Sequence, residues 1–105
     1  MKLAILIYGN QEDENKIKTH LDRLQKQLNY FKDDEAEVLY FYDNDEASIE
    51  EKKEWLLQRT QAKYHTFLDA ETVINDYYVL KRLNAIKQGE TTKKLIELGI
   101  YNKQN

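Results

Sequence analysis

Acidic side chains follow each of three predicted strands, and they are the groups in this sequence best suited to bind a ligand. Eight of them stand shortly after a strand: Glu12, Asp13 and Glu14; Asp43, Asp45 and Glu46; and Asp69 and Glu71. No lysine or arginine is interleaved within any of the three groups. If the strands run parallel, their carboxyl ends meet at one edge of the sheet and these carboxylates lie together.

Three interpretations of this acidic edge are open. Asp69 and Glu71 could hold Mg²⁺ or Mn²⁺, because hard divalent cations prefer carboxylate oxygens. Alternatively, a partner protein with a basic surface could supply the counter-charge. The third interpretation is purely structural, because an acid in the first turn of a helix interacts favourably with the helix dipole by about 0.3–1 kcal/mol.

Tyrosine is the second candidate for binding, because its ring and hydroxyl suit protein interfaces as well as core edges. The pair Tyr77 and Tyr78 lies within the third predicted helix, residues 72–87, whose apolar pattern covers more than one face. Such a helix needs two coverings, one from the sheet and one from the last helix or from another chain. The sequence therefore leaves open a homodimer with this helix between subunits.

The elements that position these residues alternate between strand and helix. An apolar run at residues 2–8 is typical of a strand buried on both faces, and residues 37–42 and 63–68 form two further apolar strands. Apolar residues at helical spacing predict helices over residues 12–30, 48–62 and 72–87. Ser48 and Glu51 have the spacing of a capping box. A short last helix begins at Thr91 or Thr92 and ends before Gly99.

This alternation predicts an α/β fold with a small parallel sheet of three strands, flanked by three main helices and a short C-terminal helix. The first strand is the most apolar, which favours strand order 2-1-3. At 105 residues the chain has the size of one domain. We expect that domain to span residues 1–101 and residues 102–105 to fray.

Composition excludes several function classes. The net charge of -3 argues against direct nucleic-acid binding, and the absence of cysteine excludes disulfides and thiolate metal sites. No apolar run is long enough for a membrane span and no leader is recognisable, so a cytoplasmic protein is the expectation. Gly9 has no neighbouring glycine and is followed by acids, which argues against unaided phosphate binding. His20 and His65 lack a nearby nucleophile and are interpreted as structural.

One stretch also resembles a known family. It reads Glu-Glu-Lys-Lys-Glu-Trp-Leu-Leu over residues 50–57, then Thr-Gln-Ala-Lys-Tyr over residues 60–64 and Phe-Leu-Asp-Ala-Glu over residues 67–71. This resembles family-2-type glycosyltransferases of the GT-A fold, including small phage-borne versions, which read roughly G-E-K-R-N-x-L-L, A-x-G-x-Y and F-x-D-x-D. Glu50, Lys53, Glu54 and Ala62 depart from that pattern.

The resemblance covers about residues 1–85 and implies a truncated nucleotide-binding half. It implies that Asp43 lies near a uracil ring and that Asp69 and Glu71 replace the metal-binding acids. The chain has no segment after it that is long enough for an acceptor site. The resemblance therefore implies the fold more than the activity.

The leading hypothesis is a non-enzymatic binding or inhibitor protein, encoded by a phage or mobile element. Its acidic edge would engage a basic surface of a host or defence protein. One alternative is a metal-dependent module that binds a sugar nucleotide through Asp43, Asp69 and Glu71. The other alternative is the homodimeric interaction domain.

Overall fold

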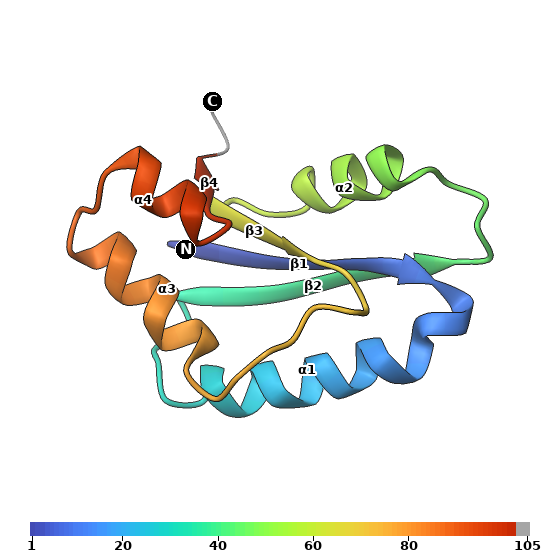
Figure 1. Ribbon diagram of the computed structural model, residues 1–105, viewed down its shortest axis with the longest axis horizontal. Helices are drawn as coiled ribbons and strands as arrows, with labels where there is room; N and C mark the ends of the chain where they lie inside the picture. The colour runs from blue at the N-terminus through green and yellow to red at the C-terminus, as the bar shows by residue number, and fades with distance from the viewer. Residues whose placement is uncertain (103–105) are drawn as a thin grey trace.

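The computed structural model describes residues 1–102 and has the predicted alternation of strands and helices (Figure 1). Its elements in chain order are β1 (Leu3–Asn10), a short 3-10 turn (Gln11–Asp13), α1 (Glu14–Leu28), β2 (Ala36–Asp43), α2 (Ile49–Leu57), β3 (Tyr64–Leu68), α3 (Tyr78–Lys87), α4 (Thr92–Glu97) and β4 (Tyr101–Asn102). The α/β class is confirmed. None of the described helices is long and apolar enough to cross a membrane.

The sheet corrects one prediction. The three parallel strands β2, β1 and β3 are present in the expected order, but the sheet has a fourth strand and is mixed. β4 pairs antiparallel with β3, with Asn102 opposite Tyr64. Asn102 therefore belongs to the sheet and not to a frayed tail, and residues 103–105 of the predicted tail lie outside the described residues. A strand of two residues leaves no periodicity that the sequence could show.

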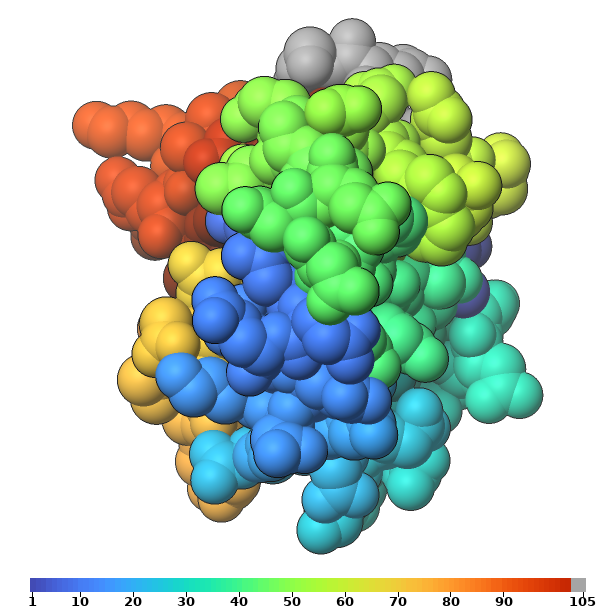
Figure 2. Space-filling view, turned by 90° about the vertical axis from the view of Figure 1, so that its right-hand side faces the viewer, coloured from blue at the N-terminus to red at the C-terminus, as the bar shows by residue number. Residues whose placement is uncertain are grey.

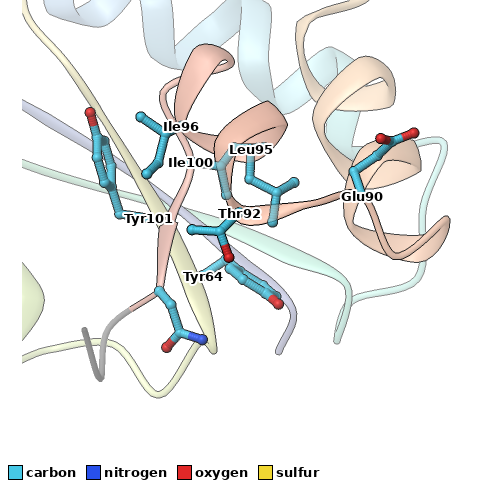
Figure 3. Close-up of a pocket in the computed structure, with 8 residues that line it drawn as sticks. Tyr64, Glu90, Thr92, Leu95, Ile96, Ile100 and Tyr101 are labelled. Atoms are coloured by element: carbon cyan, nitrogen blue, oxygen red, sulfur yellow. The ribbon is translucent and has the colours of Figure 1, made fainter.

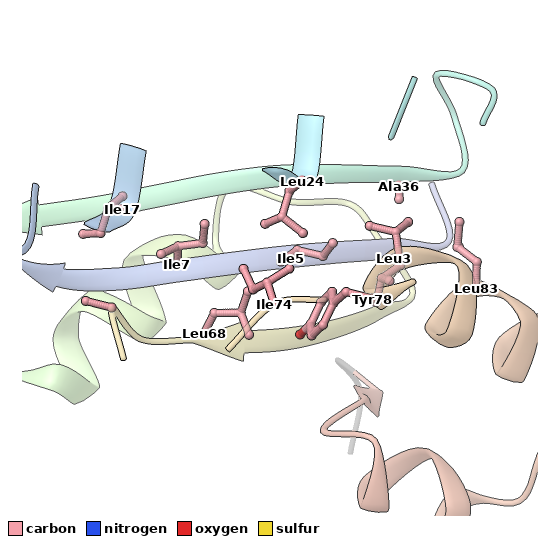
Figure 4. Close-up of a cluster of buried hydrophobic side chains, with 12 residues drawn as sticks. Leu3, Ile5, Ile7, Ile17, Leu24, Ala36, Leu68, Ile74, Tyr78 and Leu83 are labelled. Carbon is pink, nitrogen blue, oxygen red and sulfur yellow. The ribbon is translucent and has the colours of Figure 1, made fainter. Parts of the chain in front are cut away.

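β1 lies at the centre because both of its faces are covered. Leu3, Ile5 and Ile7 pack in one cluster with residues of α1 and α3, while Ala4 and Leu6 pack in a second cluster with α2. All five side chains are fully buried. Figure 1 shows α1 and α2 on opposite sides of the sheet, and Figure 4 shows the larger of the two clusters. The uninterrupted apolar run of the sequence is thus explained by a strand with no solvent-facing side.

The last helix closes the end of the sheet at which the parallel strands begin. Leu95 and Ile100 are buried beside Tyr64 of β3. Gly99 has a φ of 75°, which a glycine tolerates at the end of a helix. A hollow of about 150 Å³ remains between α4, β3 and β4 (Figure 3). It lies at the opposite end from the acidic loops.

The second predicted helix is shorter than expected, because α2 ends at Leu57 and not at Ala62. Thr60 is buried, and its hydroxyl donates to Glu37 Oε1 and accepts from the Ala62 amide at 3.1 Å. These bonds offer the backbone an alternative to the helix and turn it toward β3.

The third predicted helix begins six residues later than expected, at Tyr78 and not at Thr72. The residues between β3 and α3 form an ordered loop over residues 69–77. Val73, which the apolar pattern assigned to the helix, stands in this loop with its side chain exposed. The loop is held by side chains of α1, which are described with the site.

Candidate functional site

The three acidic loops meet at one edge of the molecule. β1, β2 and β3 run parallel, so the segments that follow them share the carboxyl edge of the sheet. Figure 2 looks onto this edge and shows the segment after β1, in blue, next to the segment that leads to α2, in green. We name the carboxylates of these loops the acidic rim; its members are Glu12, Asp13, Glu14, Asp43, Asp45, Glu46, Asp69 and Glu71.

A buried lysine, Lys52 of α2, reaches into the rim. Its side chain is only 3% exposed, and its ammonium lies 2.9 Å from Asp43 Oδ1. The same ammonium donates to the carbonyl oxygen of Gly9 at 2.9 Å and to Asn10 Oδ1 at 2.6 Å. Lys52 therefore ties α2 to the ends of both β1 and β2. The sequence analysis missed this cation, because it considered only charges interleaved within the loops.

Both oxygens of the Asp43 carboxylate are engaged in this arrangement. In addition to Lys52, it accepts hydrogen bonds from the backbone amides of Asp45 at 3.1 Å and Ala47 at 3.0 Å. The ammonium of Lys52 and these amides hold the pKa of Asp43 below its usual value. Asp45 has a φ of 66°, a conformation that aspartate tolerates better than most residues. The role of Asp43 in this structure is to shape the loop between β2 and α2.

Two other rim carboxylates have cationic partners on α1. Glu14 lies 3.0 Å from Lys18 Nζ and accepts a hydrogen bond from the hydroxyl of Tyr42 at 3.1 Å. These bonds lower the pKa of Glu14 and raise that of Tyr42. Glu71 pairs with Lys16 across the gap between the β3 loop and α1. Both pairs are exposed to solvent, so they contribute little to stability.

The rest of the described rim carboxylates form no direct ion pair. Within residues 1–102, five rim carboxylates lie in no ion pair with a lysine, arginine or histidine: Glu12, Asp13, Asp45, Glu46 and Asp69. They come from all three loops, and four of the five are exposed, Asp13 being half-buried. The edge therefore keeps a net negative charge after its internal ion pairs are formed.

Asp69 and Glu71, the predicted metal ligands, are each engaged in contacts within the protein. Asp69 Oδ1 accepts from the amide of Glu71 at 3.0 Å and from the hydroxyl of Thr72 at 2.9 Å, so its carboxylate closes a local turn. Glu71 points to Lys16 instead. In the described part of the chain, no three aspartate, glutamate or histidine side chains are placed to hold a metal ion.

Gly9 has a packing role. A Cβ at this position would lie 2.9 Å from Ile17 Cδ1 and 3.2 Å from Asp13 Oδ2. The glycine thus allows α1 to approach the end of β1 closely. Its carbonyl oxygen accepts from Lys52, which places a cation and not an open phosphate cradle at this turn.

Three polar side chains of α1 hold the loop that carries Asp69 and Glu71. They stand on one face of the helix and bond backbone carbonyl oxygens of the loop. The contacts are His20 Nε2 with Ala70 O at 3.1 Å, Arg23 Nη1 with Ile74 O at 3.3 Å and Gln27 Nε2 with Asn75 O at 2.7 Å. His20 is thereby a structural residue of the loop, as the sequence analysis expects. Ile74 is buried in the core, which fixes the loop from its other side.

We expect replacement of Gln27 by leucine to loosen this loop. Its side-chain oxygen also accepts from the amide of Val79 at 2.9 Å, so the change would leave the start of α3 and a loop carbonyl without partners. The expected loss is about 1–3 kcal/mol in the free energy of unfolding. Urea denaturation measures it, together with faster hydrogen exchange at Val79. Gln25→Leu, which removes only a contact with Asn29 on the exposed side of α1, serves as the matched control.

The two candidate tyrosines differ in solvent exposure. Tyr77 is 68% exposed and, with Tyr30 and Leu80, lines an open groove of about 860 Å³ between α1 and α3. Tyr78 is only 5% exposed and lies in the core, where burial raises its pKa. Tyr78 therefore presents no surface to a partner, which corrects the prediction for this residue. Tyr77 stands six residues after Glu71, but the groove that it lines contains none of the rim carboxylates.

Comparison with known proteins identifies no relative. No protein-family model matches the chain, and no curated protein or solved structure matches it either. The glycosyltransferase resemblance therefore stays an expectation from the sequence. The functional argument depends on the geometry and charge of the rim.

Proposed function

We propose that this chain is a non-enzymatic binding protein whose acidic rim engages a basic surface of another protein. The observation that carries the proposal is the set of five carboxylates without an ion pair, contributed by three loops that the parallel sheet brings to one edge. Complementary charge steers association and selects the partner. An inhibitor of a host or defence protein, encoded by a phage or mobile element, is the form of this function that the sequence favours.

The interior contacts of the rim support binding at its surface in preference to chemistry within it. The ammonium of Lys52 stands between the ends of β1 and β2, bonded to Gly9 and Asn10. Asp43, which the glycosyltransferase resemblance assigns to a uracil ring, would have to exchange three hydrogen bonds for one ligand. Four of the five carboxylates without an ion pair, those of Glu12, Asp45, Glu46 and Asp69, are exposed to solvent. That arrangement suits contact with a wide cationic surface.

The test is affinity capture with two variants of equal charge. The rim variant is Glu12→Gln, Asp45→Asn and Glu46→Gln. The control variant makes the same three kinds of change at exposed acids elsewhere, as Asp33→Asn, Glu54→Gln and Glu97→Gln. We expect the wild type and the control to retain the same basic protein from a bacterial lysate at low salt. The rim variant should bind that protein about tenfold more weakly, because its complementary charge is lost.

Salt provides the second readout, because exposed charges are screened over about 10 Å at 0.1 M ionic strength. Raising the salt concentration should release the partner from the wild type and from the control. A partner that the rim variant retains as firmly as the wild type would contradict the proposal. So would retention that salt does not affect, because the contact would then depend on apolar surface.

A further inference from the structure

β2 is an edge strand with an open side. Leu3 N donates to Glu35 O at 3.1 Å, and the register places Leu3 opposite Ala36. In a parallel pair, alternate residues direct their backbone groups to the neighbouring strand. Glu35 and every second residue after it therefore face β1. The residues between them turn their amides and carbonyls outward; these are Ala36, Val38, Tyr40 and Tyr42. No other group within residues 1–102 bonds these outward amides and carbonyls.

This edge lacks the features that usually prevent strand addition. The β1–β2 register runs without a bulge from Leu3–Ala36 to Asn10–Asp43. The five residues 38–42 carry no charge, and the chain contains no proline. Natural edge strands are commonly protected by such charges, bulges or prolines. The opposite side of the sheet is protected, since β4 has only two residues.

Apolar side chains border the open edge on both faces of the sheet. Tyr40 is 49% exposed and stacks with Tyr42, with 6.0 Å between the ring centroids. On the other face, the ring of Phe41 packs against the partly exposed ring of Trp55, with 4.7 Å between the ring centroids. An added strand would therefore find apolar neighbours for its alternate side chains, as strand-addition interfaces require.

The charges at the two ends of β2 differ. At its start, Glu35 has two cationic neighbours, Lys2 and Lys87. Its end leads directly into Asp45 and Glu46, which are exposed and have no cationic partner among the described residues. A complementary strand would therefore be apolar along most of its length and basic at the end that meets the rim.

We propose that the β2 edge binds an extended segment of the protein partner as an additional strand, with lysine or arginine at the end next to Asp45 and Glu46. This inference rests on the proposed function and names the form in which the basic partner is recognised. Main-chain hydrogen bonds to Val38, Tyr40 and Tyr42 provide the attachment. The acidic rim selects the basic end and sets the direction of the segment.

The experiment uses short synthetic peptides as probes with the full chain. Two peptides of alternating threonine and valine are compared. One carries three lysines at its amino end and the other carries three lysines at its carboxyl end, so that both strand directions are offered. We expect one of them to slow hydrogen exchange at Val38, Tyr40 and Tyr42 by about tenfold or more. Replacing its lysines by glutamates should weaken binding by about tenfold at low salt. Methylating the peptide amides that face β2 should abolish it.

Protein variants separate the edge from other surfaces. Tyr40→Lys places a charge on the edge and should abolish peptide binding, while Tyr30→Lys, at an exposed tyrosine elsewhere, should leave it unchanged. Absence of binding by either peptide would overturn the inference. Peptide binding without protection of the β2 amides would also overturn it, while leaving the rim function standing. If the same amides are protected without peptide, and the protein sediments with the mass of two chains, the edge pairs with a second copy of the chain instead and the inference is overturned.

Discussion

A Lys52→Met variant is expected to unfold about 3 kcal/mol more easily than the wild type, because removal of one member of a buried ion pair leaves its partners without compensation. Methionine keeps most of the aliphatic volume of the lysine but donates no hydrogen bond. Asp43, Asn10 and the carbonyl of Gly9 would all lose their shared donor. Urea denaturation at neutral pH measures the change in unfolding free energy.

Lys53→Met is the matched control, because it makes the same change at the next residue of the same helix. The ammonium of Lys53 lies over the rings of Tyr8 and Phe67, at 5.3 and 5.2 Å from their centroids, and is bonded to no carboxylate of residues 1–102. Loss of that contact should cost less than about 1 kcal/mol. Equal destabilisation by the two variants would show that Lys52 contributes through helix formation and not through its contacts in the rim.

The ion pair also predicts a dependence on pH. The pKa of Asp43 is lowered in the folded protein, chiefly by Lys52. A carboxyl group of this kind stabilises the fold fully above its unfolded pKa of about 3.9. The contribution is lost as the pH falls through the lower, folded value. The stability difference between the wild type and Lys52→Met should therefore shrink below about pH 4.

The parts of the fold that local patterns determine were predictable from the sequence. The capping box is one example: Glu51 N donates to Ser48 Oγ and Ser48 N donates to Glu51 Oε1, both at 3.1 Å. The central position of β1 is another, because its apolar run has no polar side to expose. The common edge of the three acidic loops follows from these elements, since parallel strands end together.

The parts that the sequence did not reveal depend on contacts between distant residues. The loop over residues 69–77 replaces a predicted helical start because His20 and Gln27 of α1 bind its carbonyls from about fifty positions away. Lys52 left a weak local signal. It stands four residues before Leu56, which is fully buried, and therefore lies on the inward side of the helix. A charged residue at such a position indicates a buried partner, and the acids after β2 were the available one.

The second large effect is expected in the core beneath β1. Leu24 of α1 is fully buried in the same cluster as Ile5 and Leu83, where α1, α3 and the sheet meet (Figure 4). Leu24→Ala should lower the unfolding free energy by about 2–5 kcal/mol, the sum of lost apolar transfer and the cavity left behind. Urea denaturation followed by circular dichroism measures the loss.

Leu80→Ala provides the comparison, because Leu80 is 41% exposed on α3 and lines the open groove. A substitution at such a position usually changes stability by less than about 0.5 kcal/mol. Leu24 also lies on α1 between Arg23 and Gln27, which hold the loop of Asp69. Loss of core packing at Leu24 should therefore also loosen that loop of the acidic rim. Leu24→Ala should therefore speed hydrogen exchange in residues 69–77 as well as in α1. Faster exchange confined to α1 would show that the loop is held without the core.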